Sequence, residues 1–305
     1  ALLLQAAHAA ETPKDCPPTA QAPTAEQMQQ AQAAAKDRGA LWRLSKDGRN
    51  SYLYGTVHVR PRGADWGNAR VRAAIDESGE VWTELLMNPE ADQQIQILAQ
   101  RLGTAEPGHP LSSWLTPEEN ASLNAVTARL GFPQGALEGY KPWLAALTLT
   151  VAPLVRAGYD SDSGVDRSID AYSDAAGKSM RALETAEQQL TFFANLGPDI
   201  QREMLREAIA ESEDLPAMLG EMSTAWEHGD EEALSQAVVE ETRTEYPELY
   251  QMLFLDRNNA WMTALTHEME GSGVDFVAVG AGHIIGRDGL VAQFRARGYR
   301  VERVR

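Results

Sequence analysis

Strand-like patterns of apolar residues are few and short in this sequence, and they lie towards the two ends of the chain. Residues 41–59 alternate apolar and polar positions around the turn-forming run 46–50, which predicts a β-hairpin. Residues 274–280 are almost continuously apolar, as expected of a strand that is covered on both faces. Further strands are predicted at residues 80–86 and 299–304.

Helical periodicity dominates the rest of the chain. Apolar residues that recur every three or four positions predict helices at residues 66–77, 91–102, 117–130, 137–157, 163–178 and 289–297, with four or five acidic helices within 186–269. Asp65, Ser163 and Asp288 are the expected N-caps of three of them. A short strand is predicted at residues 179–185. The fold class is therefore α/β: a small central mixed β-sheet built from strands at both ends of the chain, with a large inserted helical block.

The N-terminal segment differs in composition from the remainder. Residues 1–9 resemble the end of an apolar signal-peptide region, followed by the cleavage-type pattern Ala7-His8-Ala9. Residues 10–40 are rich in Ala, Gln and Pro, which predicts a flexible segment with a short helix at 25–37. Residues 41–305 are expected to form a single domain. We therefore expect a periplasmic or secreted protein.

Charge and composition exclude some classes of function. The 305 residues include 27 Lys and Arg against 44 Asp and Glu, a net charge of -17, which argues against a nucleic-acid partner. Beyond the leader, no apolar run approaches the roughly 20 residues that a membrane span needs. The single cysteine, Cys16, cannot form an internal disulfide.

Two matching G-x-x-H motifs follow predicted strands. Gly55-Thr56-Val57-His58 ends the hairpin, and Gly280-Ala281-Gly282-His283 follows the apolar strand near the C-terminus. If these strands are parallel, His58 and His283 lie at the same edge of the sheet, where open α/β sheets hold their ligands. Either histidine alone is more typical of a loop residue that hydrogen-bonds to backbone.

Glu84 adds a carboxylate to this pair. It is a polar residue among apolar neighbours at the end of its predicted strand, where an unpaired carboxylate is unfavourable. Two histidines and a carboxylate on three strand ends predict a divalent-metal site with open positions for water and substrate. The alternative is a simple ion pair of Glu84 with one of the arginines Arg60, Arg62 and Arg70.

The two G-x-x-H motifs, the glutamate between them, ALETAEQQ (182–189) and VGAGHIIGRDGLVAQFRARGYRVERV (279–304) resemble the TraB/GumN family, which is related to the Tiki-type metalloproteases. The resemblance covers about residues 41–305. It implies that His58, Glu84 and His283 occupy the family's invariant positions and that the site is similar to that of manganese- or cobalt-dependent peptidases. More distant relatives include an erythromycin-esterase-like group and haem-binding lipoproteins.

Two further residues are candidates for the site. Arg257 matches a recurrent family position and is expected to hold a substrate carboxylate or a transition-state oxyanion. Its alternative is an ion pair with Asp256 or Glu187. Glu184 is a candidate for orienting a histidine by accepting its second N–H, or a simple acid at a helix start.

The first functional hypothesis is an extracytoplasmic metal-dependent hydrolase, with peptide cleavage favoured over other reactions. Its expected catalytic residues are His58, Glu84, His283 and Arg257, of which the first three bind the metal. Manganese or cobalt is implied by the resemblance, and zinc is the alternative. Two rival hypotheses are a haem- or metal-binding protein without turnover and a metal-free esterase-like hydrolase with His58 or His283 as general base. The expected partner is a peptide or small-molecule substrate, and no oligomeric state is predicted.

Overall fold

The computed structural model describes residues 38–271 and 273–305. The predicted leader, Cys16 and the predicted helix at 25–37 lie outside the described residues. The described residues group into two compact units. The helical unit comprises residues 88–161 and 185–219, and the sheet unit comprises 38–87, 162–184 and 220–305. The expectation of one domain over 41–305 stays a prediction.

The sheet unit is built on six strands in the order β6-β4-β7-β2-β1-β8. These strands are β1 (Leu41–Lys46), β2 (Arg49–Thr56), β4 (Glu80–Thr83), β6 (Ser179–Ala182), β7 (Asp275–Gly280) and β8 (Arg300–Arg303). Strands β6, β4, β7 and β2 are mutually parallel, whereas β1 is antiparallel to both of its neighbours. The predicted mixed α/β architecture, with strands from both ends of the chain in one sheet, is confirmed.

The hairpin turn is shorter than the sequence pattern suggested. Lys46 pairs with Arg49, so that the loop contains only Asp47 and Gly48. Both loop residues have positive φ, 51° and 77°, as a type I′ turn requires. The two-residue turn fixes the register that brings Thr56 to the end of β2.

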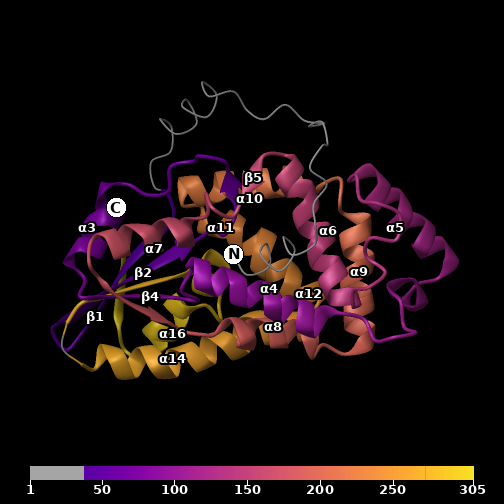
Figure 1. Cartoon of the computed structure of the whole chain (residues 1–305). Coiled ribbons are helices and arrows are strands. Elements are labelled where there is room, and N and C mark those ends of the chain that lie inside the picture. The colour runs from indigo at the N-terminus through magenta and orange to yellow at the C-terminus, as the bar shows by residue number, and fades with distance from the viewer. Residues whose placement is uncertain (1–37, 272) are drawn as a thin grey trace. The chain divides into compact units, whose positions relative to one another are not determined.

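Strand β7 lies at the centre of the core. All six of its residues are buried, and Phe276 to Val279 have no exposed surface. Figure 1 shows α3 (Ala69–Glu77) and α7 (Val165–Ala175) on one side of the sheet and α14 (Asp256–Met269) and α16 (Leu290–Ala296) on the other. Burial on both faces explains why the sequence of β7 is continuously apolar rather than alternating.

One further helix and several short elements connect these larger ones. They are β3 (Arg60–Pro61), α10 (Leu215–His228), α11 (Glu231–Leu234), η2 (Ser235–Glu240), α12 (Glu241–Glu245), α13 (Pro247–Tyr250), η3 (Gln251–Leu255) and α15 (Ala281–Ile284). Segments η2 and η3 are π-helical. The predicted group of acidic helices is therefore more fragmented than its periodicity indicated.

The helical unit has its own apolar core. It contains α4 (Pro89–Gly103), η1 (Leu111–Trp114), α5 (Pro117–Arg129), α6 (Pro142–Arg156), β5 (Tyr159–Asp160), α8 (Ala186–Ala194) and α9 (Pro198–Ala210). Helix α6 is buried along most of its length and packs on α9.

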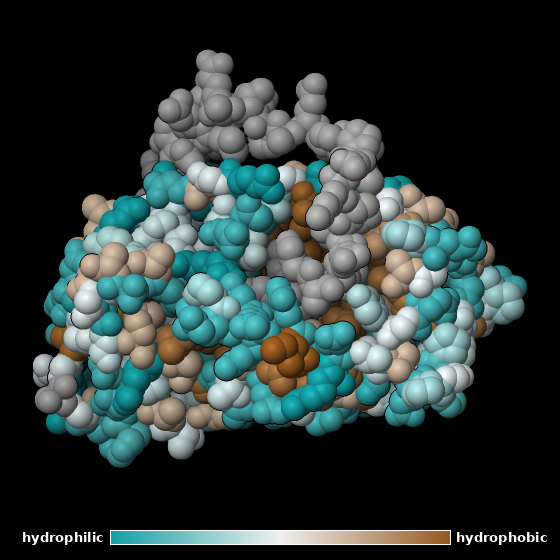
Figure 2. All heavy atoms as spheres, viewed as in Figure 1, coloured by the Kyte–Doolittle hydropathy of each residue, from teal (hydrophilic) through white to brown (hydrophobic). Residues whose placement is uncertain are grey.

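None of the described helices is long and apolar enough to cross a membrane. Hydrophilic residues dominate the face in Figure 2, and the exposed large hydrophobic side chains in the described part are Ile97 and Met218.

The predicted N-caps were wrong in each case. Helix α3 begins three residues later than expected and is capped by the side chain of Asn68 rather than by Asp65. Residues Gly164 and Gly289 precede α7 and α16, and neither provides a side-chain cap. The expected caps bond elsewhere: Ser163 accepts a hydrogen bond from the Gly63 backbone, and Asp288 accepts one from a tyrosine hydroxyl. Long-range partners thus replaced the local role that the sequence predicted for these side chains.

Candidate functional site at the carboxyl edge of the sheet

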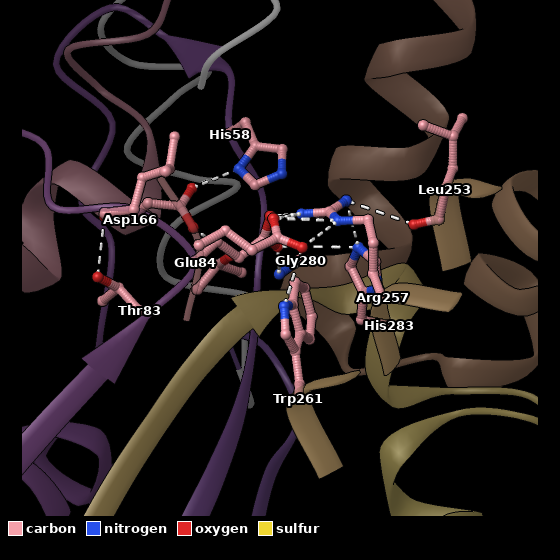
Figure 3. Close-up of polar contacts among 12 residues, drawn as sticks. His58, Thr83, Glu84, Asp166, Leu253, Arg257, Trp261, Gly280 and His283 are labelled. Carbon is pink, nitrogen blue, oxygen red and sulfur yellow. Dashed lines mark hydrogen bonds and ion pairs between the residues drawn. The ribbon is translucent and has the colours of Figure 1, made fainter. Parts of the chain in front are cut away.

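Three candidate residues follow strands that end at the same edge of the sheet. Strands β2 and β7 are parallel, with Thr56 opposite Gly280, and β4 runs parallel to β7 on its other side. His58 lies two residues after β2, and Glu84 directly follows β4. The parallel arrangement therefore brings His58, Glu84 and His283 to one edge, as Figure 3 shows.

Gly280 is the point of closest approach in the site. Its backbone N–H donates to Glu84 Oε1 at 2.7 Å. A Cβ at this position would lie 3.2 Å from both Glu84 Oε1 and His58 Nε2. Any larger residue would therefore fill the space between the carboxylate and the imidazole, which explains the glycine at the strand end.

His58 is oriented by a buried aspartate. Its Nδ1 lies 2.7 Å from Asp166 Oδ2, and Asp166 Oδ1 accepts a hydrogen bond from Thr56 Oγ1 at 2.5 Å. Burial raises the pKa of Asp166, but its contacts with His58 outweigh burial and lower the pKa overall. Among the described residues, His58 Nε2 has no hydrogen-bond partner. The aspartate therefore fixes the proton on Nδ1 and leaves the Nε2 lone pair open.

His283 is oriented by an amide instead of a carboxylate. Its Nδ1 lies 2.9 Å from Asn258 Oδ1, and Arg257 Nη1 lies 3.0 Å from its Nε2. The ring of Trp261 lies 4.5 Å from the imidazole, centroid to centroid. Burial, followed by the charge of Arg257, lowers the pKa of His283 to about 3, although Glu84 opposes this shift. His283 is therefore neutral, with a proton on Nδ1 and a lone pair on Nε2.

Arg257 connects two carboxylates. Its Nη2 donates to Glu84 Oε2 at 2.7 Å and to Glu184 Oε2 at 2.8 Å, and its Nε donates to Glu184 Oε1 at 2.9 Å. Glu184 also accepts from the indole N–H of Trp261 at 3.0 Å. The arginine is buried, with 11 % of its side chain exposed. Its position on α14, in contact with Glu84 and His283, places it within the candidate site.

The ion-pair partners suggested for Arg257 by the sequence were wrong. Asp256 accepts a hydrogen bond from Gln251, and Glu187 pairs with Arg101 at 2.6 Å in the helical unit. Asp256 is adjacent to Arg257 in the sequence, and Glu187 closely follows Glu184. The observed partners of Arg257 are instead determined by the packing of α14 on the sheet.

Two of the three arginines suggested as partners of Glu84 bond to other groups. Arg60 pairs with Glu227, and Arg70 donates to the backbone oxygens of Val304 and Gly39. Glu84 is instead held by Arg257 and by the N–H of Gly280.

Two residues that orient the histidines were missed by sequence reasoning. Asp166 and Asn258 accept from the histidine Nδ1 atoms, a role that the sequence assigned to Glu184. Glu184 pairs with Arg257 instead. Asn258 could have been suspected because it is adjacent to Arg257, whereas Asp166 carried no local signal beyond its place in the first turn of a helix.

Helix α7 positions two of the segments that carry residues of the candidate site. One turn after Asp166, the carboxyl group of Asp170 accepts a hydrogen bond from the Met87 backbone N–H at 2.7 Å. Asp166 thus fixes the segment after β2, and Asp170 fixes the segment that begins at Glu84. Burial is the main cause that raises the pKa of Asp170 to about 7.

The site contains an excess of negative charge. Burial raises the pKa of Glu84, but the charge of Arg257, together with the Gly280 N–H, outweighs it and holds the pKa well below its usual range. The carboxylates of Glu84, Glu184 and Asp166 face a single guanidinium, while His283 is neutral. A buried group of this composition favours an additional cation.

The donor set fits a divalent metal in type, and one contact opposes it. Each histidine has its Nδ1 held by an acceptor, the usual arrangement for an Nε2 ligand. The N–H of Arg257, however, uses the same His283 lone pair that a metal ion requires. Among the described residues, the three acidic or histidine side chains whose donor atoms all lie within 4.8 Å of one another are Glu80, Glu268 and Asp275, not the predicted trio. Binding at the trio therefore requires Arg257 to release His283.

The fold and this edge define an α/β protein with a histidine- and carboxylate-rich site at the ends of parallel strands. The chain matches the sequence profile of the TraB/PrgY/gumN family over residues 40–303 and belongs to that family. No curated protein and no solved structure matches the chain.

Proposed function

We propose that this protein is an extracytoplasmic metal-dependent hydrolase that cleaves peptide bonds. One observation carries the proposal. His58 and His283 each have Nδ1 held by an acceptor, at the edge where Glu84 is kept ionised beside the Gly280 turn. This combination directs two imidazole Nε2 atoms and one carboxylate into the site from three different strand ends.

His58 Nε2, His283 Nε2 and Glu84 Oε1 would hold the ion. A bound divalent metal would supply Lewis acidity and lower the pKa of a water molecule. Manganese or cobalt is favoured by the family resemblance, with zinc as the alternative. The low pKa of Glu84 suits a ligand better than a proton acceptor, because a weakly basic carboxylate takes up protons poorly.

Arg257 would act in the same site. While it donates to His283, its N–H groups are directed at Glu84, Glu184, His283 and the Leu253 carbonyl. Release of His283 would free Nη1 for a substrate carboxylate or carbonyl oxygen, and Glu184 would still hold the guanidinium through Nε and Nη2. Asp166 and Asn258 would keep both imidazoles in the tautomer that leaves Nε2 unprotonated.

Metal analysis of protein purified without chelator tests the proposal. We expect bound metal in the wild type and a loss of it in both His58→Ala and His283→Ala. His109→Ala, a substitution of an exposed histidine in the helical unit, is the matched control and should leave the metal content unchanged. Equal metal content in all four proteins would contradict the assignment.

The location outside the cytoplasm has a separate test. It rests on the apolar and A-x-A-type character of residues 1–9, which lie outside the described residues. Mass spectrometry of the protein from the periplasmic and culture fractions should find the chain there with its N-terminus cut near residue 9. A full-length chain found only in the cytoplasmic fraction would contradict it.

A metal-free esterase-like hydrolase is the second candidate, and the His58–Asp166 contact favours it. A histidine bonded to a buried aspartate is a suitable general base, and Arg257 already occupies His283 Nε2. This reaction would survive EDTA, and it would be lost in His58→Ala but retained in His283→Ala. Metal-dependent hydrolysis would instead be lost in both variants and after EDTA treatment.

A further inference from the structure

A second group of acidic residues lies at the opposite edge of the same sheet. Glu80 and Asp275 begin β4 and β7 and are register partners on these neighbouring strands. Glu268 lies in the last turn of α14. One carboxylate oxygen from each of the three lies within 4.8 Å of the other two. We call these three residues the amino-edge cluster.

Each member of this cluster is unfavourably placed without a cation. Like charges directly opposite each other on neighbouring strands are destabilising. An acidic side chain in the last turn of a helix also faces the negative end of the helix dipole. Since Glu80 and Asp275 are such a strand pair and Glu268 is such a helix residue, three unfavourable placements converge on one point.

Asp275 provides an observation independent of the clustering. It exposes only 9 % of its surface, and its carboxylate has no hydrogen-bond or ion-pair partner among the described residues. Burial, together with the charges of Glu268 and Glu80, raises its pKa. A nearly buried carboxylate whose charged neighbours are also carboxylates needs a positive ion to compensate it.

Arg181 supplies a positive charge near the cluster, but its contact with the cluster is long. Arg181 Nε lies 3.6 Å from Glu80 Oε2, beyond hydrogen-bond distance, and its guanidinium lies over the Trp82 ring. Glu80 Oε2 is itself buried without a hydrogen bond, and Glu80 Oε1 receives a long contact of 3.4 Å from Ser179 Oγ. This single long ion pair does not neutralise three carboxylates.

We propose that Glu80, Glu268 and Asp275 form a second cation site that binds a hard divalent ion of the calcium class. All three ligands are carboxylate oxygens, the donors that calcium prefers, and they come from separate elements that allow a flexible coordination shell. Nitrogen ligands, which favour transition metals, occur at the other edge of the sheet. The cation would tie the end of α14 to the starts of β4 and β7. Since α14 also carries Arg257 and Asn258, the ion would hold the helix that serves the candidate active site.

Thermal unfolding with and without Ca²⁺ tests this site. Millimolar Ca²⁺, added to chelator-treated protein, should raise the Tm of the wild type by about 5 °C. Asp275→Asn should abolish this rise. Glu270→Gln, an exposed acidic neighbour on the same segment, is the matched control and should respond like the wild type.

The metal-free proteins give a second, opposite signature. Without Ca²⁺, Asp275→Asn should melt at a higher temperature than the wild type, because it removes a repulsive charge and keeps the shape of the side chain. With saturating Ca²⁺ the order should reverse. A wild type that does not respond to Ca²⁺, or an Asp275→Asn variant that responds equally, would overturn the proposal. In the first of these cases the carboxyl groups share protons instead of binding a metal.

Tb³⁺ luminescence excited through tryptophan measures binding directly. Trp82 lies two residues after Glu80 on β4 and therefore on the same face of the strand. Emission should appear with wild-type protein and with a His58→Ala/His283→Ala double variant, and Ca²⁺ should displace it. Emission that is lost in the double variant but kept in Asp275→Asn would assign the ion to the carboxyl edge and contradict the second site.

Discussion

Acidic residues have different surroundings at the two edges of the central sheet. At the carboxyl edge, Glu84 is held by the Arg257 guanidinium and by the N–H of Gly280. At the amino edge, Asp275 lies beside Glu80 and Glu268, and the described part of the chain places no comparable donor next to it. Strands β4 and β7 begin with acidic residues and are followed by Glu84 and His283, so the presence of titratable residues at the strand ends does not account for the difference.

The comparison shows that compensation, rather than burial, sets the state of a carboxylate. Burial raises the pKa at both edges, yet the pKa of Glu84 is low and that of Asp275 is high. The cause is the sign of the neighbouring charge. Substitutions of the compensating residues should therefore have large effects at the carboxyl edge, and substitutions of the acids themselves should have large effects where no compensation exists.

The largest expected effect is a loss of stability on removal of Arg257. Arg257→Ala leaves the buried carboxylates of Glu84 and Glu184 uncompensated, and breaking such a buried pair costs about 3–5 kcal/mol. Urea unfolding measures the change. Arg101→Ala, which breaks the exposed pair with Glu187, is the control and should cost about 1 kcal/mol or less. Equal costs for the two variants would show that the carboxyl edge is not a compensated site.

The second effect concerns catalysis and compares the two ends of β4. Glu84→Gln keeps the shape of the side chain but removes the charge, and it should lower kcat/KM by about 100-fold or more on a substrate that the wild type cleaves. Glu80→Gln at the opposite end of the strand should lower kcat/KM far less, because Glu80 acts on the active site only through the hold of the amino-edge ion on α14. Assays with metal in excess and circular dichroism of both variants separate lost chemistry from lost folding. Turnover of Glu84→Gln near that of the wild type would end the assignment of Glu84.

The third effect tests whether Asp166 acts through His58. Asp166→Asn removes the charge that holds the Nδ1–H of His58, and a loss of such a partner lowers metal affinity by about 10–100-fold. Competition with a metal-sensitive dye measures the affinity. Asp174→Asn, an exposed change on the same helix, should bind like the wild type. A matching loss in Asp174→Asn would point to a general effect on α7 instead of an effect on the imidazole.

The smallest effect is on the pH dependence of the metal-free protein. His283 has a folded pKa of about 3 against 6.5 for the free side chain, so the unfolded chain takes up the proton first and stability falls as the pH drops below about 6.5. Asp170 has a folded pKa of about 7 against 3.8 for the free side chain. Its contribution to the free energy of unfolding is therefore present at low pH and is lost as the pH rises from 3.8 to about 7. The two slopes oppose each other between about pH 4.5 and 6.5.

Asp170→Asn separates these contributions. In the wild type the free energy of unfolding should change little across this range, whereas in Asp170→Asn it should fall by roughly 1 kcal/mol per pH unit on acidification. Urea titrations at several pH values measure both profiles. Parallel profiles would show that Asp170 is ionised in the folded protein.

The positions of the strands and of the three site residues were within reach of the sequence. Alternation along residues 41–59 and the apolar run before Gly280 are local signals, since each element displays its own burial pattern. The G-x-x-H motifs indicated where two strands end, and a parallel sheet is sufficient to bring such ends to one edge. The fold class and the gathering of His58, Glu84 and His283 could therefore be anticipated.

The partners of these residues were decided by the tertiary structure alone. Asp166 lies 108 residues from His58 along the chain, and Arg257 lies 173 residues from Glu84. Such contacts depend on the rotation of α7 and α14 against the sheet, which no local pattern encodes. The pairing of Glu80 with Asp275 likewise requires the register between β4 and β7. Sequence patterns report which face of an element is buried, whereas the identity of the group on the other side of that face is set by packing between segments far apart in the chain.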